Sequence, residues 1–263
     1  MGELGAYLAI GAVVGFFAGL LGIGGGIIIV SSLALMYTHH GFAPQYVMHL
    51  AIGTSLAAML AGSFSSLRAH DRHGAVDWSV VKGMTPGLLA GVLASSFIAR
   101  LVPAAILKYF FLGFALMVTV QMVLNAKPKP SRQLPHGAGL AGAGLAIGAI
   151  SGFGGGGAAA IGVPFLTWCN VSTHRAIGTV AAMAFPLAFA GSLGYVVAGW
   201  SVAELPRWSL GFVYLPALLG ISVTSMLTAP LGARLAHRLP AATLRRIFAL
   251  FLIAMGVKVA ISV

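Results

Sequence analysis

The sequence predicts an all-α polytopic membrane protein made of two homologous halves. Three features lead to this fold class: long uncharged runs, a glycine cluster in each half, and an internal duplication. The 263 residues are 59% hydrophobic and 7% charged, whereas an ordinary soluble domain has roughly 25% charged residues. No Asp, Glu, Lys or Arg occurs between Glu3 and Arg68. A helix needs ~20 mostly apolar residues to cross the bilayer core, so the lipid bilayer is the expected surrounding.

Each half contains a glycine cluster inside an apolar run. Glycine costs roughly 1 kcal/mol relative to Ala in a helix interior, so three or four in a row favour a broken helix over close packing alone. The half-helix after a break presents free N–H groups and a positive dipole end, which attract anions. Matching breaks in two halves are typical of a transporter's binding site. The predicted substrate-binding glycines are Gly24, Gly25, Gly26, Gly154, Gly155, Gly156 and Gly157.

Four further elements recur in the same order and indicate an internal repeat. They are His49–Thr54 with His174–Thr179, Gly62–Ser63 with Gly191–Ser192, Pro86–Gly91 with Pro216–Gly220, and Pro103–Lys108 with Pro240–Arg245. We therefore expect a first repeat over residues 1–124, a polar linker over 125–136 and a second repeat over 137–263. Each repeat should have four hydrophobic segments: Tyr7–Tyr37 and Gly139–Cys169, those starting near Pro44 and Ser172, Trp78–Ala99 and Trp208–Pro230, and those starting at Pro103 and Pro240.

The first segment of each half either crosses the membrane or folds back as a re-entrant hairpin. Straight crossings would divide the 15 basic residues almost evenly between the two faces. Hairpins would place eleven on one face: Arg68, Arg72, Lys82, Lys127, Lys129, Arg132, Arg175, Arg234, Arg238, Arg245 and Arg246. The other face would keep Arg100, Lys108, Arg207 and Lys258. The positive-inside rule expects such an asymmetry, so we favour hairpins, an inverted second half and a cytoplasmic linker.

Polar residues after the glycine segments are the remaining candidates for the site. Thr54, Ser55 and Thr179 either bond a carbonyl one turn back or face the substrate. His49 and His174 either start helices or act in coupling or gating.

Arg175 has two open interpretations. It is either a topology charge or a fixed cation that attracts an anion at the mouth of a pathway.

Several classes of function are excluded or disfavoured. All four acids, Glu3, Asp71, Asp77 and Glu204, lie near the start of the chain or in expected loops, so no intramembrane carboxylate is available as a relay or catalytic acid. We expect no enzyme activity, no cofactor and no metal. The net charge of +11 is attributed to topology rather than to nucleic acid. Gly152–Gly157 matches G-x-G-x-x-G but follows a membrane segment and has no acid ~20 residues later, so dinucleotide binding is rejected.

The paired glycine motifs, each followed by His-x-Ala-Ile-Gly-Thr, resemble the sulfite exporter TauE/SafE family of membrane permeases. The resemblance covers essentially the whole chain. It implies a carrier of sulfite, organosulfonates or other small oxyanions. One difference is Ser31, at a position where proline is common in such motifs, although Pro164 keeps it in the second half.

The function expected is therefore secondary transport of a small anionic substrate, sulfite or a sulfur-containing oxyanion, across a bacterial-type cytoplasmic membrane. A passive anion channel is the alternative, because the membrane segments lack carboxylates. The coupling ion, H+ or Na+ if there is one, the direction of transport and the formation of a homodimer stay open.

Overall fold

The computed structural model describes residues 2–21, 25–124, 130–236 and 241–262. These residues form ten α-helices and one pair of very short strands. In chain order the elements are α1 (Gly2–Leu21), α2 (Gly26–His39), α3 (Pro44–Arg72), α4 (Trp78–Leu101), α5 (Ala104–Val123), α6 (Ala138–Phe153), α7 (Ala158–Trp168), α8 (Thr173–Gly199), β1 (Ser209–Leu210), β2 (Val213–Tyr214), α9 (Leu215–Ala236) and α10 (Ala241–Ser262).

The predicted all-α polytopic fold is confirmed in its main features. Five helices are long and apolar enough to span a membrane: α3, α4, α5, α8 and the part of α9 up to Gly232. Each of the two expected first segments is divided into two shorter helices, α1 with α2 and α6 with α7, on either side of a glycine cluster.

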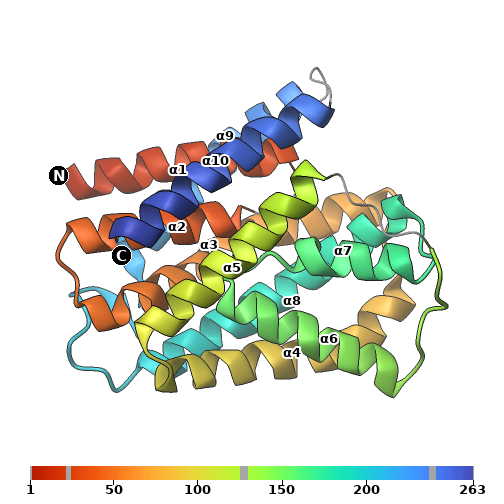
Figure 1. Ribbon diagram of the computed structural model, residues 1–263, viewed down its shortest axis with the longest axis horizontal. Helices are drawn as coiled ribbons and strands as arrows, with labels where there is room; N and C mark the ends of the chain where they lie inside the picture. The colour runs from red at the N-terminus through yellow and green to blue at the C-terminus, as the bar shows by residue number, and fades with distance from the viewer. Residues whose placement is uncertain (1, 22–24, 125–129, 237–240, 263) are drawn as a thin grey trace.

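Helices α3 and α8 form the centre of the molecule, and α3 is the most deeply buried of the five long helices. They are antiparallel. Gly53 of α3 lies against Tyr195 of α8, and Phe64, eleven residues later, packs against Phe185, with ring centroids 5.2 Å apart. Figure 1 shows α1, α9 and α10 along one side of the molecule and α4 and α6 along the other.

Two helix pairs pack closely through small residues. Gly87 and Gly91 of α4 face the backbone of α6 near Ala141 and Leu145, where there is no space for a Cβ atom. Gly11 of α1 faces the α9 backbone in the same way. Spacings of four residues between glycines let two helix backbones approach, and dispersion contacts hold helices together where the hydrophobic effect is absent. In both pairs the two helices run parallel.

One predicted element differs from the structure. The segment expected over Trp208–Pro230 does not begin as a helix at Trp208; residues 208–214 form the antiparallel pair β1–β2, and α9 begins at Leu215. Gly211 at the turn has a φ of 54°, and Trp208 itself has a φ of 68°. These backbone angles are incompatible with a right-handed helix, so the apolar run is divided between a tight hairpin and a helix.

The molecule has two ends, which we name by residues. The Asp77 end holds residues 68–82, 131–138 and 168–175, and the Arg100 end holds 39–46, 99–104 and 199–214. At the Asp77 end the Arg175 guanidinium lies 3.3 Å from the Asp77 carboxylate, and the Ser131 N–H donates to the Trp168 carbonyl at 3.2 Å. At the Arg100 end Arg100 donates to Ser201 at 3.0 Å. In Figure 1 the Asp77 end is on the right.

The α4–α6 packing yields a stability test. Gly87→Val should lower the apparent melting temperature in detergent by roughly 2–12 °C, because overpacking costs ~1–3 kcal/mol and each kcal/mol shifts a domain of this size by ~2–4 °C. Gly113→Val is the matched control, since a Cβ there meets open space on α5. Equal melting temperatures for the two variants would show that the α4–α6 contact is not tight.

Candidate functional site

Both glycine clusters adopt backbone conformations that side chains disfavour. Gly25 has a φ of 51° and precedes the first residue of α2. Gly155, Gly156 and Gly157 have φ angles of 68°, 113° and 88°, and α7 begins directly after them. Each cluster therefore ends one helix and starts another with a changed direction. Gly154 is the last-turn residue that closes α6. Gly24 lies outside the described residues.

The two breaks meet at Ser55 of α3. The Ser55 hydroxyl donates to the Gly155 carbonyl at 2.9 Å and lies 3.2 Å from the Gly26 carbonyl. The backbones themselves are in contact, because a Cβ added to Gly26 would lie 2.6 Å from the Gly155 oxygen. Ser55 is fully buried. One hydroxyl thus bridges glycine segments that are more than a hundred residues apart in the sequence.

The surroundings of this junction are apolar. Val30 of α2 and Met59 of α3 contact the positions where side chains on Gly155 and Gly156 would be, and the Phe114 ring of α5 lies against Gly154 and Gly157. Since the first N–H groups of an α-helix have no partner within the helix, the starts of α2 and α7 bring amide donors to a dry junction. Helix starts are typical anion-binding sites, whereas the backbone groups that contact Ser55 are the carbonyls of Gly155 and Gly26.

Thr54 and Thr179 have partners in the opposite half of the chain. The Tyr214 N–H, just before α9, donates to the Thr54 hydroxyl at 2.9 Å. The Asp77 N–H, just before α4, donates to the Thr179 hydroxyl at 3.0 Å. Tyr37 also reaches Thr54, with 3.4 Å between the two hydroxyl oxygens. Each threonine therefore fixes a loop that leads into a helix of the other half; contact with a substrate stays a prediction.

The glycine before each threonine completes this contact. Gly53 faces the Phe212 carbonyl and Gly178 faces the Ala75 carbonyl, in both cases too closely for any Cβ. The repeated Ala-Ile-Gly-Thr sequence thus has the same function at both ends of the molecule: glycine admits a loop backbone, and threonine accepts one of its N–H groups.

The two histidines of the repeated motif lie in different environments. His49 is 3% exposed, and its Nε2 lies 2.8 Å from the Ala99 carbonyl, so Nε2 carries the donated hydrogen. His174 is exposed at the start of α8. Their shared motif position therefore does not give them a shared environment.

Arg175 forms an ion pair with Asp77, as described above. The pKa of the Asp77 carboxyl is lowered, chiefly by the hydrogen bond from the Ser79 hydroxyl, and further by the Val80 N–H and the Arg175 charge. Burial acts in the opposite direction but is outweighed. Arg175 is thus an exposed cation at the Asp77 end, and its charge is partly neutralised there.

Sequence reasoning missed several residues of the junction. Met59 and Phe114 contact the glycines, and Tyr195 donates to the Gly152 carbonyl at 3.2 Å. None of them belongs to a repeated motif. The helical spacing of Met59 four residues after Ser55 was the only available signal. Among the described residues no group of three His, Cys, Asp or Glu side chains could hold a metal ion.

Comparison with known proteins identifies the family. The model of the sulfite exporter TauE/SafE family matches residues 7–259, almost the entire chain. The chain belongs to this family. Members of the family are membrane transporters and not enzymes, and the chain is a multi-pass membrane protein.

Curated relatives of this TauE/SafE member cover most of its length. A Haemophilus influenzae protein named a probable membrane transporter protein is 35% identical over 254 residues, 95% of this chain and 96% of the relative. Probable membrane transporter protein YdhB of Bacillus subtilis is 28% identical, covering 88% of this chain and 89% of its own. Probable membrane transporter protein MJ0441 of Methanocaldococcus jannaschii is 24% identical and covers 95% and 92%. No solved structure matches the chain.

The threonine contacts predict an effect on stability. Thr54→Val leaves the buried Tyr214 N–H without its acceptor, and Thr179→Val does the same to the partly buried Asp77 N–H, at a cost of ~1–3 kcal/mol each, so each should lower the melting temperature by roughly 2–12 °C. Thr119→Val is the control, because the hydroxyl of this buried residue donates only to the carbonyl one turn back in α5. Thr54→Ser should remain close to wild type. Wild-type stability in both valine variants would exclude a structural function of these hydroxyls.

Proposed function

We propose that this TauE/SafE member is a secondary transporter of a small oxyanion, sulfite or an organosulfonate, across the cytoplasmic membrane. The observation that carries the proposal is the buried junction at Ser55, where the starts of α2 and α7 meet. The substrate would replace part of its hydration with amide N–H groups of Gly25, Gly26, Gly155 and Gly157, and with the Ser55 hydroxyl once that hydroxyl exchanges its carbonyl acceptor for the anion. Thr54 and Thr179 would fix the loops before α9 and α4, and so the positions of the helices around this site.

Charge supports an anion rather than a cation. Asp71 and Asp77 lie at the Asp77 end, and Glu204 lies in the loop between α8 and β1, where Gln45 donates to it at 2.7 Å. None of these three carboxylates faces the junction. Intramembrane carboxylates are the usual cation and proton relays, so coupling to H+ or Na+ would have to use other groups.

We further propose inverted halves with re-entrant first segments. Several contacts support this arrangement. The Ser131–Trp168 hydrogen bond joins the segment before α6 to the end of α7, and Gly83 near the start of α4 contacts Leu140 near the start of α6. The α6–α7 pair thus begins and ends at the Asp77 end. In the first half Tyr7 of α1 lies 6.5 Å, between ring centroids, from His40, which follows α2.

The distribution of basic residues supports a cytoplasmic Asp77 end. Arg68, Arg72, Lys82, Arg132 and Arg175 belong to that end of the described structure. Arg100 in the last turn of α4, Lys108 near the start of α5, Arg207 just before β1 and Lys258 near the end of α10 belong to the opposite end. Loops rich in Lys and Arg stay in the cytoplasm, so this orientation agrees with the positive-inside rule.

Transport is tested with purified protein in liposomes. Wild type should take up [35S]sulfite, and Ser55→Ala should reduce uptake about tenfold or more, because the buried Gly155 and Gly26 carbonyls lose the one donor they share, at ~1–3 kcal/mol, and the junction loses its bridge. Ser63→Ala is the control, since that hydroxyl only bonds Leu60 within α3.

A dependence of uptake on a H+ or Na+ gradient would indicate a carrier, and uptake independent of both would indicate a channel. Absence of wild-type flux of sulfite and organosulfonates would contradict the proposal.

Glycine geometry gives a second test. Gly155→Ala adds a Cβ at a φ of 68° and against Val30, so uptake should fall more than about tenfold. Gly41→Ala carries similar strain at a φ of 70° but in open space far from the junction, and its uptake should remain near wild type. Equal losses in both variants would mean that strain, not the junction, is responsible.

Topology is tested by cysteine labelling on a Cys169→Ala background. Ser131→Cys and Ser172→Cys should react with an impermeant thiol reagent from the same, cytoplasmic face, because a hairpin begins and ends on one side. Ala203→Cys should react only from the opposite face. Labelling of positions 131 and 172 from opposite faces would replace the hairpin by a straight crossing.

A further inference from the structure

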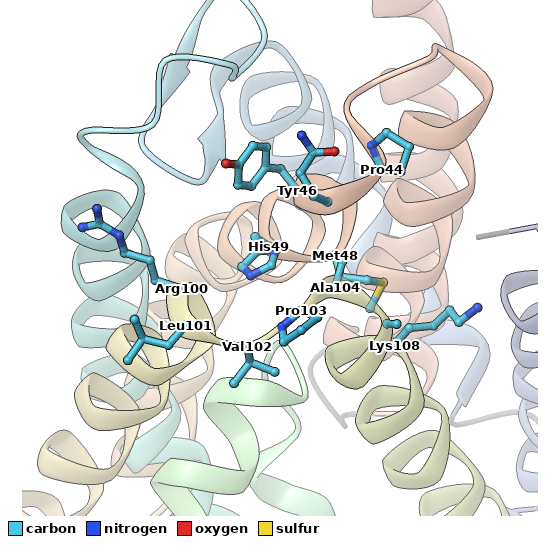
Figure 2. Close-up of a pocket in the computed structure, with 12 residues that line it drawn as sticks. Pro44, Tyr46, Met48, His49, Arg100, Leu101, Val102, Pro103, Ala104 and Lys108 are labelled. Atoms are coloured by element: carbon cyan, nitrogen blue, oxygen red, sulfur yellow. The ribbon is translucent and has the colours of Figure 1, made fainter.

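A cavity of approximately 600 Å³ opens at the Arg100 end, away from the glycine junction. It lies between the first turns of α3, the end of α4 and the first turns of α5. Figure 2 shows Tyr46 and His49 on one wall and the Arg100 to Ala104 segment on the other, with Lys108 at the side. No sequence pattern indicates this cavity, because its residues come from three separate segments.

The charges around the cavity are basic. Arg100 and Lys108 are two of the four Lys or Arg residues at this end of the described structure, and both line the same cavity. No Asp or Glu is among its 12 lining residues. Two hydrogen bonds lie at the rim of the cavity. Gln45, which lines it, donates to the carboxylate of nearby Glu204, and Arg100 donates to Ser201, so the Gln45 and Arg100 side chains are held in place.

Two further polar features lie at the cavity, the start of α5 and the ring of His49. The α5 helix begins at Ala104, which lines the cavity, so its positive dipole end and first amides are directed to this region. His49 contributes to the floor: it is 3% exposed, and its Nδ1 is buried without a hydrogen-bond partner in the structure. An unsatisfied buried ring nitrogen costs free energy unless a ligand or water completes it.

One face of α3 connects the cavity to the glycine junction. Met48 lines the cavity and is fully buried; Ile52, Ser55 and Met59 follow at spacings of four, three and four residues, which places all four on one helix face. Ile52 and Met59 contact the positions of Gly155 and Gly156 side chains. Seven residues of helix separate Met48 from Ser55, or roughly 10 Å along the axis.

We propose that this cavity is a second anion-binding site, in which Arg100 and Lys108 capture a small oxyanion before it passes along the Met48–Met59 face of α3 to the junction. Because Nε2 of His49 carries the ring hydrogen, its Nδ1 at the floor accepts a hydrogen bond from a water molecule bound to the anion. The site rests on the proposed function, since it supplies the same substrate class to the same pathway from the face opposite the cytoplasm. Met48 is the barrier between the two sites.

The transport test compares two double variants with the same loss of charge. Arg100→Gln with Lys108→Gln should raise the apparent KM for [35S]sulfite by about fivefold or more when sulfite is added at the Arg100 end, since clustered charge raises local anion concentration. The matched control is Arg207→Gln with Lys258→Gln, two exposed residues at the same end outside the cavity. It should stay within about twofold of wild type, because screening limits the effect of distant exposed charges. Equal effects of the two pairs would overturn the proposal.

A second measurement does not depend on transport. Ala105→Cys, on a Cys169→Ala background, places a thiol in the cavity wall. A sulfonate-bearing methanethiosulfonate should react faster than its trimethylammonium counterpart, and the ratio of the two rates should fall about fivefold or more in the Arg100→Gln, Lys108→Gln protein. An unchanged ratio would show that the cavity has no preference for anions, even if sulfite is transported. Absence of sulfite flux with the expected labelling ratio would instead reject the proposed function and retain the anion site.

Discussion

A peptide group released from its helix inside a bilayer has no water to bind, and this constraint determines much of the structure. Both glycine clusters release such groups. The Ser55 hydroxyl provides a donor for the carbonyls of Gly155 and Gly26, and the two breaks press against each other so closely that neither tolerates an added Cβ. The two broken helix pairs therefore stabilise each other by direct packing, and α3 stabilises both through the Ser55 hydrogen bonds. The surrounding helices bury this junction, as the proposed substrate site requires.

The same dependence governs packing. Apolar side chains gain little by leaving lipid for protein, so close backbone contact must hold the helices together. The α4–α6 and α1–α9 pairs achieve this with glycines spaced by four residues. The loop contacts of Thr54 and Thr179 add directional hydrogen bonds where helices begin, at opposite ends of the molecule. Many of the short contacts that stabilise the core thus join residues 2–124 to residues 130–262.

The sequence predicted features that depend on local composition. Uncharged runs indicated the long helices, and consecutive glycines indicated the positions where helices stop and restart. It could not show what each polar residue contacts. The acceptor function of Thr54 toward Tyr214 joins residues far apart in the sequence, and the partner is a backbone N–H that no residue type reveals. The same holds for Arg100 and Lys108, which the ends of two helices bring to one cavity, and for Trp208, where a hairpin replaced the expected helix.

The exchange of contacts between the two parts of the chain has a consequence for biosynthesis. When residues 2–124 have entered the membrane, the glycine faces of α1 and α4 still have no partners, and the Thr54 hydroxyl lacks the Tyr214 N–H, since these partners belong to α9, α6 and the residue before α9. The Asp77 N–H likewise has no Thr179 hydroxyl to donate to until α8 is inserted. The first part therefore completes its packing in stages: α4 and the Asp77 loop when α6 and α8 are inserted, and α1 and Thr54 only when α9 is inserted. A chain shortened before α9 would leave the α1 interface and the Thr54–Tyr214 contact incomplete, and membrane quality-control proteases would have an unfinished bundle as their substrate.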